Sequence, residues 1–264
     1  MTMLIKKLPH EKFPLSLLEI PQPPKTLYIA GTLPPEDTIL LTVVGSRKYT
    51  SYGKMACEKI IEGLSGYPIA IVSGLALGID TIAHRAAIEA GLKTIAVPGS
   101  GLGEKALYPA SNRGLAENII TQGGALLSEF PPDFRATQWS FPQRNRIMAG
   151  LSRGVLIVEA EEKSGTLITA RLALEYNRDV YAIPGSIFSE SAHGTNTLIR
   201  RGAAPITSSA DLLDALGFEN TKKSPADKES ANPEEALILK LLREPLSRDT
   251  IIQALNRPTH EVNM

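Results

Sequence analysis

The feature that most constrains the fold is a regular alternation of short apolar runs with helix-like segments from residue 40 onwards. The apolar runs are nearly continuous, which is typical of strands that are covered on both faces. They read ILLTVVGS, PIAIVSG, KTIAVPGSG, ALLSEF, GVLIVEA and DVYAIPG. Helices are expected between them, at Tyr52–Leu64, Leu77–Ala90, Asn112–Thr121, Arg146–Leu151, Thr166–Tyr176 and Asn196–Arg200. This alternation predicts an α/β fold with a doubly wound, mostly parallel sheet and helices on both faces.

Four parts of the chain differ in composition. Residues 1–39 are rich in proline and have little periodicity, so we expect an N-terminal extended segment that packs on the core. Residues 40–216 carry the strand–helix alternation and form the expected Rossmann-like core domain. Residues 217–235 are polar, charged and proline-containing, which is typical of a linker. Residues 236–264 predict two short amphipathic helices, the beginning of a winged-helix-like segment that stops before its third helix.

Composition restricts the possible partners. The apolar fraction of 43% suits a globular protein with a sizeable core. The formal net charge of +0 argues against coating nucleic acid by bulk charge, so an anionic partner has to be held by a local patch. The single cysteine, Cys57, excludes an internal disulfide and indicates a cytoplasmic location. We find neither a secretory signal nor an apolar run of membrane-spanning length, so no membrane partner is expected.

The turns after the expected strands share small and basic residues. A single Gly-Ser turn is usually only a turn. Here such turns recur after four strands, and the carboxyl ends of these strands are expected to lie along one edge of the sheet, where ligands bind. Glycine and serine let backbone N–H groups approach an anion, and the cations add positive charge. The candidates for binding phosphate or DNA are Gly45, Ser46, Arg47, Lys48, Ser73, Gly74, Gly99, Ser100, Lys163, Ser164 and Gly165.

The stretch SFPQRNRIMAGLSRG places Arg144, Asn145 and Arg146 directly in front of an apolar helical run. A helix start favours acids, so two arginines there are unfavourable unless an anion meets them. Guanidinium groups beside a helix N-terminus suit a phosphate, and we expect these residues to join the site. Phe141 and Trp139 flank the basic segment. Two roles are open for each ring, packing in the core or stacking on an unpaired base.

Other motifs argue against common cofactors. GSGLG continues into EKALYP rather than a clear helix, so it does not match the dinucleotide fingerprint, and KSGT lacks the order of a Walker A loop. No second histidine or cysteine lies at metal-ligand spacing. Asp80 and His84 lie four residues apart on one helix face, and we favour a structural role over a catalytic pair. The sequence therefore predicts no cofactor.

Several stretches together resemble the bacterial DNA-processing protein A family (DprA, also called Smf). They are VGSRKYTSYG, IVSGLALGIDTIAHRAAI, TIAVPGSGLGEKALYPASN, LLSEFPP, FPQRNRIMAGLS, VLIVEAEEKSGTLITARLALE, VYAIPGSI and GTNTLIRRGA. Each is weak alone, but the ordered set is specific. The resemblance implies an extended Rossmann-like fold and no established enzymatic reaction. It also implies binding of single-stranded DNA during natural transformation, protection of the incoming strand, and help in loading the RecA recombinase.

The resemblance also assigns individual residues. It implies single-strand contacts by Arg47 of the GSR turn and by Phe141 before RNR. Some members have a lysine three residues before that aromatic ring, where this chain has Gln138. The family forms homodimers through its core, and we place the interface at Leu198 and Ile199, which lie among polar neighbours in a short expected helix.

Two other functions compete with this interpretation. The loop EKSGTLITA resembles that of the nucleotide phosphoribohydrolases often labelled lysine-decarboxylase-like, which use a Gly-Gly-x-Gly-Thr-x-x-Glu loop. Here Lys163 and Ser164 replace the leading residues and Thr169 occupies the glutamate position. The loop therefore lacks the carboxylate that would act as acid or base. A mononucleotide-binding sensor would need the same pocket but no groove for a strand.

Overall fold

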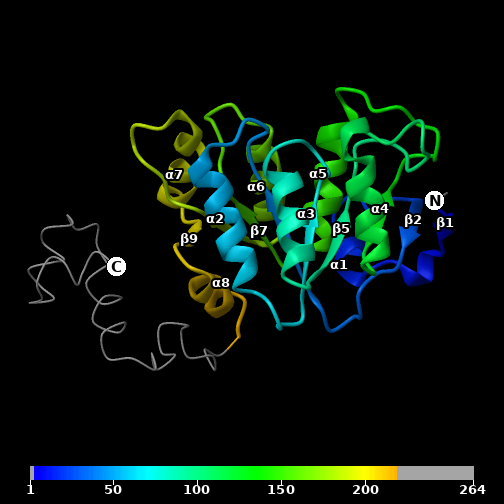
Figure 1. Ribbon diagram of the computed structural model, residues 1–264, viewed down its shortest axis with the longest axis horizontal. Helices are drawn as coiled ribbons and strands as arrows, with labels where there is room; N and C mark the ends of the chain where they lie inside the picture. Colours follow the sequence, from blue (N-terminus) through cyan, green and yellow to red (C-terminus); the bar gives the residue numbers. More distant parts are fainter. Residues whose placement is uncertain (1–2, 219–264) are drawn as a thin grey trace, which may run out of the picture. The chain divides into compact units, whose positions relative to one another are not determined.

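The computed structural model of the chain describes residues 3–218, which form a nine-stranded sheet with helices on both faces (Figure 1). The strands are β1 (Ile5–Leu8), β2 (Leu27–Gly31), β3 (Ile39–Val44), β4 (Ile69–Ser73), β5 (Lys93–Ala96), β6 (Ala125–Ser128), β7 (Gly154–Ile157), β8 (Asp179–Ala182) and β9 (Ala204–Pro205). The α-helices are α1 (Leu15–Leu18), α2 (Ser51–Glu62), α3 (Ile79–Glu89), α4 (Arg113–Thr121), α5 (Ser140–Leu151), α6 (Thr166–Glu175), α7 (His193–Arg200) and α8 (Ser209–Ala215). Short 3-10 helices are η1 (His10–Lys12), η2 (Ala110–Asn112) and η3 (Glu190–Ala192).

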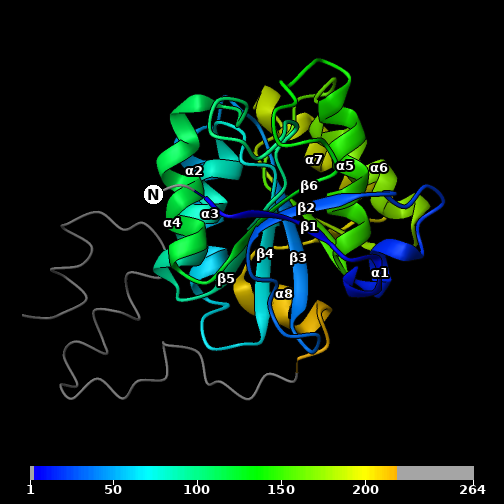
Figure 2. The same ribbon diagram turned by 90° about the vertical axis from the view of Figure 1, so that its right-hand side faces the viewer.

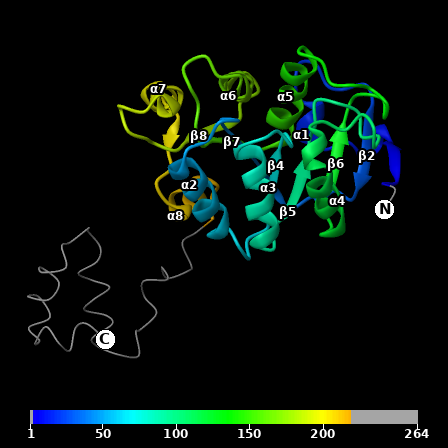
Figure 3. The same cartoon turned by 45° about the horizontal axis from the view of Figure 1, so that its top comes forward.

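The sheet is doubly wound, as predicted. Its strand order is β1-β2-β6-β5-β4-β3-β7-β8-β9, which Figure 3 follows from β2 on one side to β8 on the other. Strands β3 to β9 pair in parallel, whereas β1 and β2 are antiparallel to their neighbours. The chain winds outwards from β3 to β6, crosses back, and winds outwards again from β7 to β9. All parallel strands therefore end at one edge, on both sides of the switch between β3 and β7.

The helices form a layer on each side of the sheet (Figure 2). Helices α2, α3 and α4 pack side by side on one face, with α8 against α2, and α1, α5 and α6 pack on the other. Alternate residues of a strand point to opposite layers. Leu41 and Val43 of β3 join the core under α2 and α3, whereas Val44 joins the core under α5 and α6. Because both faces are buried, the strands need continuous apolar runs, which is why the sequence showed them without alternation.

The N-terminal part differs from the expectation. Residues 1–39 were predicted to be an extended segment that packs on the core, but they contain two strands of the sheet, β1 and β2, and helix α1, which packs against α5. Leu17 and Ile20 are buried in the core on that side. The strand signal was weak because β1 reads IKKL, with both lysines exposed, and because prolines surround β2. A short edge strand with exposed lysines is a common way to protect a sheet edge.

The predicted linker, residues 217–235, lies outside the described residues except for its first two, and the winged-helix-like segment at 236–264 lies wholly outside them. Within residues 3–218, no helix is long and apolar enough to cross a membrane.

Candidate nucleic-acid interface

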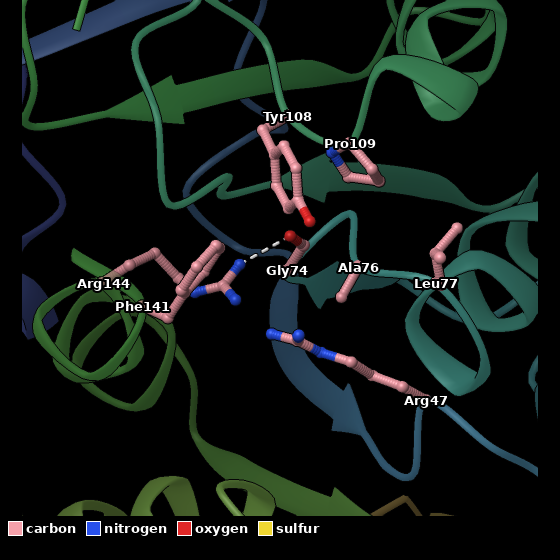
Figure 4. Close-up of a pocket in the computed structure, with 8 residues that line it drawn as sticks. All are labelled: Arg47, Gly74, Ala76, Leu77, Tyr108, Pro109, Phe141 and Arg144. Carbon is pink, nitrogen blue, oxygen red and sulfur yellow. Dashed lines mark hydrogen bonds between the residues drawn. The ribbon is translucent and has the colours of Figure 1, made fainter. Parts of the chain in front are cut away.

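Four segments from different parts of the chain meet at the carboxyl edge of the parallel strands (Figure 4). They are the turns after β3 and β4, the loop after β5 and the first turns of α5. Together they line a pocket with an empty volume of about 320 Å³, part of which is open solvent. Its lining residues are Arg47, Gly74, Ala76, Leu77, Tyr108, Pro109, Phe141 and Arg144.

Arg47 and two aromatic rings form the accessible part of this pocket. The guanidinium carbon of Arg47 lies 5.2 Å from the centre of the Phe141 ring, within the range of a cation–π contact. The Tyr108 ring centre lies 5.7 Å from that of Phe141, and the two planes are inclined at 55°. Arg47 is exposed and Tyr108 is 49% exposed. The site therefore presents a cation and aromatic surface to solvent at the same place.

Phe141 is held in position by a glycine and a serine. A Cβ at Gly99 would lie 2.6 Å from Cδ1 of Phe141, so only glycine leaves room for the ring. The neighbouring Ser140 is buried and donates a 2.6 Å hydrogen bond from Oγ to the Gly99 carbonyl. The glycine was expected to bring backbone N–H groups to an anion. Its observed role is to seat an aromatic side chain.

The predicted position of Arg144 is wrong. Helix α5 begins at Ser140 rather than at Arg146, so Arg144 lies inside the helix and not before its N-terminus. Arg144 is 4% exposed, and its Nη1 donates a 2.6 Å hydrogen bond to the Gly74 carbonyl (Figure 4). The same atom donates to the Val97 carbonyl. A Cβ at Gly74 would collide with this guanidinium. Arg144 thus ties the turn after β4 and the end of β5 to α5.

Asn145 lies beside Arg144 and is also largely buried. Its Oδ1 accepts a 3.2 Å hydrogen bond from Arg144 Nε. Both residues were predicted to meet an anion directly. Their described contacts instead anchor the inner wall of the pocket.

A buried carboxylate accompanies the buried arginine. Asp80 Oδ2 accepts a 3.1 Å hydrogen bond from the Gly74 backbone N–H. Burial lowers the pKa of Arg144 to about 10; the charge of Asp80 opposes this shift and that of Arg47 adds to it. Burial likewise raises the pKa of Asp80, against the charge of Arg144. With a pKa of about 10, Arg144 remains a cation at neutral pH.

Arg146 points to a different part of the molecule. It forms an ion pair with Glu129 and donates a 2.5 Å hydrogen bond to the Gln22 carbonyl. Burial raises the pKa of Glu129, and the charge of Arg146 opposes that shift. Arg146 therefore tethers the N-terminal segment to α5 and does not line the pocket.

Several predicted residues lie next to the pocket without lining it. Ser46 Oγ donates to the Lys48 carbonyl at 2.8 Å and accepts from the Lys48 N–H at 3.0 Å, which shapes the turn that carries Arg47. The Gly45 carbonyl accepts a 3.2 Å hydrogen bond from Thr166 Oγ1, at the start of α6. The preceding loop, Lys163, Ser164 and Gly165, therefore comes close to the end of β3 but not into the pocket.

The hydroxyls of Ser73 and Ser100 are used internally. Ser73 Oγ donates to the Val43 carbonyl at 2.7 Å, between neighbouring strands. Ser100 Oγ donates to the Gly101 carbonyl at 2.9 Å and accepts from the Tyr108 N–H at 3.1 Å. Ser100 thereby positions the loop that carries Tyr108.

Sequence reasoning missed half of the lining residues, namely Ala76, Leu77, Tyr108 and Pro109. Their signal was present, because each lies in a loop that directly follows an expected strand. The expected structural role of His84 agrees with the geometry: it is buried, and Nδ1 lies 2.7 Å from Thr94 Oγ1. Within residues 3–218, no three His, Cys, Asp or Glu side chains lie close enough to hold a metal ion.

The predicted dimer residues lie at the far end of the sheet. Leu198 and Ile199 belong to α7, are partly exposed, and lie next to strand β8. Leu198 packs against the core under α5 and α6, whereas Ile199 is not part of a buried cluster within the described chain.

Comparisons with known proteins agree with the architecture. Residues 5–217 match the family model of the DNA recombination-mediator protein A. Protein Smf of Escherichia coli is 38% identical over 261 residues, which cover 96% of this chain and 69% of that protein. The crystal structure of DNA processing protein A from Streptococcus pneumoniae superposes with a TM-score of 0.73 at 41% identity, covering 81% of this chain and 75% of that one. A structure of the Helicobacter pylori protein, reported for its single-stranded DNA binding mode, gives 0.71 at 31% identity, covering 82% and 98%. This chain is a member of the DNA recombination-mediator protein A family.

Proposed function

We propose that this protein binds single-stranded DNA in the pocket at the carboxyl edge of its sheet. The observation that carries the proposal is the exposed Arg47 guanidinium over the Phe141 ring, with Tyr108 beside it. Single-strand binding sites combine cations with aromatic rings, because the cation attracts a phosphate while the ring stacks on the face of a base.

The geometry favours a single strand over a duplex. The faces of bases are available for stacking only when they are unpaired, and the pocket offers aromatic surface rather than a wide basic groove. With a formal net charge of +0, the chain has no general attraction for DNA, so affinity has to come from this local site. The single-strand binding of the related H. pylori protein supports the same function here.

The finer functions belong to the same proposal. We propose that the chain protects incoming DNA, helps to load the RecA recombinase onto it, and acts as a cytoplasmic homodimer through Leu198 and Ile199. Membership of a recombination-mediator family supports the recombinase role. The recombinase role is tested directly by measuring RecA filament assembly, with and without this protein, on a single strand that is coated by a single-strand-binding protein.

We propose binding rather than catalysis. Thr169, which occupies the glutamate position of the phosphoribohydrolase loop, is buried in α6 with 1% exposure. The buried carboxylates near this edge are also engaged. Asp80 accepts from Gly74, and Glu159 accepts from the Thr50 N–H and hydroxyl at 3.0 and 2.6 Å. We therefore assign these two carboxylates to holding the turns at this edge rather than to acid/base chemistry.

The test compares three ligands. Fluorescence anisotropy of a labelled single strand is measured with duplex of equal length and nucleoside monophosphate as competitors, and the monophosphate is assayed for base release. We expect both competitors to bind at least about tenfold more weakly, a difference of about 1.4 kcal/mol. Preferential duplex binding would contradict the proposal. Tight mononucleotide binding would favour the sensor, and base release would favour the enzyme.

A further inference from the structure

The chain contains one tryptophan, and its indole is unusually exposed for so large an apolar group. Trp139 is 54% exposed at the start of α5. Its ring centre lies 5.7 Å from that of Phe130 and 5.6 Å from that of Phe134, with interplanar angles of 76° and 63°. The two phenylalanines stack on each other at 4.4 Å, so the cluster has its own packing and Trp139 lies at its outer side.

The support beneath the indole is fixed by backbone hydrogen bonds. Gly101 N–H donates to the Phe134 carbonyl at 2.9 Å, and Gly103 N–H donates to the Pro132 carbonyl at 2.8 Å. These bonds join the loop before α5 to the loop that leads to Tyr108. An aromatic ring on a fixed support loses little conformational freedom when a ligand covers it.

Trp139 is also next to the proposed DNA site. It and Phe141 flank the buried Ser140, whose hydroxyl is bonded to Gly99. Residues two apart at a helix start are turned by about 200° and displaced by about 3 Å along the axis. By this ideal geometry the two side chains leave the start of α5 in different directions, so a DNA strand held on Phe141 has to cross that end of the helix to reach Trp139.

We propose that Trp139 is a second stacking surface for the same single strand, and that it takes a base beyond the one at Phe141. This inference rests on the proposed function. Arg135 lies in the same loop and takes part in no ion pair among the described residues, but Asp133 lies there too. These two residues of the loop carry opposite charges, so we assign the contribution of Trp139 to its ring.

Because the indole is the only one in the sequence, its fluorescence reports on this surface in the unmodified full chain. The probes are oligo-dT strands spanning about 4 to 16 nucleotides, the range of known single-strand sites. Binding is followed by anisotropy of the labelled strand and by tryptophan emission in the same titration. We expect the emission to be quenched in parallel with binding, and Arg47→Ala to shift both curves together.

Substitutions separate stacking from packing. We expect Trp139→Ala to weaken binding of the longer strands about tenfold, which is within the effect of one stacked base. Trp139→Phe should retain most of the affinity, whereas Trp139→Leu, which keeps apolar cover over the two phenylalanines, should not. The dependence of log affinity on log salt should stay unchanged in all three, since a stacked ring neutralises no phosphate.

Normal binding without a change in tryptophan emission, or full affinity in Trp139→Leu, would overturn the inference and leave the proposed function standing. Failure of the full chain to bind any single strand would overturn both.

Discussion

The Arg47 guanidinium carbon lies 5.2 Å above the Phe141 ring, although the two residues are 94 positions apart in the chain. Arg47 follows β3, whereas Phe141 lies in α5, which joins β6 to β7. The doubly wound topology brings them together, because all the parallel strands end at one edge. Neither residue would mark a site alone, and their combination is what a nucleotide with an unpaired base requires.

We expect the Phe141 ring to contribute to DNA affinity by stacking on a base rather than by filling space. Phe141→Ala should cost about 1–3 kcal/mol of single-strand affinity. Phe141→Leu keeps an apolar side chain over Gly99 and should lose most of the same affinity while melting close to the native chain. If the leucine variant binds normally, Phe141 packs against its neighbours and does not stack.

Arg144 should matter for stability. Arg144→Met leaves the Gly74 and Val97 carbonyls without this donor, and it removes the cation whose charge opposes the rise in the pKa of Asp80. We expect the free energy of unfolding to fall by about 1–3 kcal/mol for each buried carbonyl that is left unpaired. Arg47→Met removes an exposed arginine and serves as the control in the same urea titrations. Equal stability of the two variants would contradict the anchoring role of Arg144.

The sequence alone was sufficient to predict the sheet and the edge of the sheet that carries the candidate site. Continuous apolar runs identified β3 to β8, because a strand that is buried on both faces has to be apolar along nearly its whole length. It was not sufficient for the role of each side chain. Arg144 and Arg146 lie two residues apart in one helix and therefore face different directions, one into the pocket wall and one towards Glu129. The start of α5 was misplaced because SFPQ is polar and contains proline, and a proline is tolerated in the first turn of a helix.

The dimer prediction rests on Ile199. If α7 forms the interface, Ile199→Glu should shift sedimentation towards the monomer while the protein stays folded, because a charge in an apolar contact loses its hydration. Arg200→Glu places an acid at the neighbouring exposed position and should leave the assembly intact. A dimeric Ile199→Glu protein would place the interface elsewhere, and an unfolded one would show that Ile199 serves the core.

His84 should make the fold sensitive to acid. Burial and, secondarily, the charge of Arg144 hold the pKa of His84 at about 3, below its ordinary value of 6.5. Between these values the unfolded chain binds a proton that the folded chain does not. The contribution of His84 to stability is therefore largest above pH 6.5 and falls with decreasing pH, by up to about 1.4 kcal/mol per pH unit.

The matched variant for this prediction is His84→Asn, which keeps a polar group towards Thr94 but does not titrate. Urea unfolding at about pH 7 and about pH 4.5 should show a smaller loss of stability for the variant than for the native chain. Equal losses would mean that other groups cause the acid sensitivity.

The most direct test of the central claim is the salt dependence of single-strand binding in Arg47→Ala, with Lys54→Ala as control. Lys54 is an exposed cation of α2 that pairs with Glu58 and does not line the pocket. We predict that Arg47→Ala binds more weakly and that its slope of log affinity against log salt is smaller by about 0.7 to 1, the change for one lost phosphate contact. Lys54→Ala should match the native chain in both respects. Native affinity and native slope in Arg47→Ala would contradict the assignment of this pocket as the DNA site.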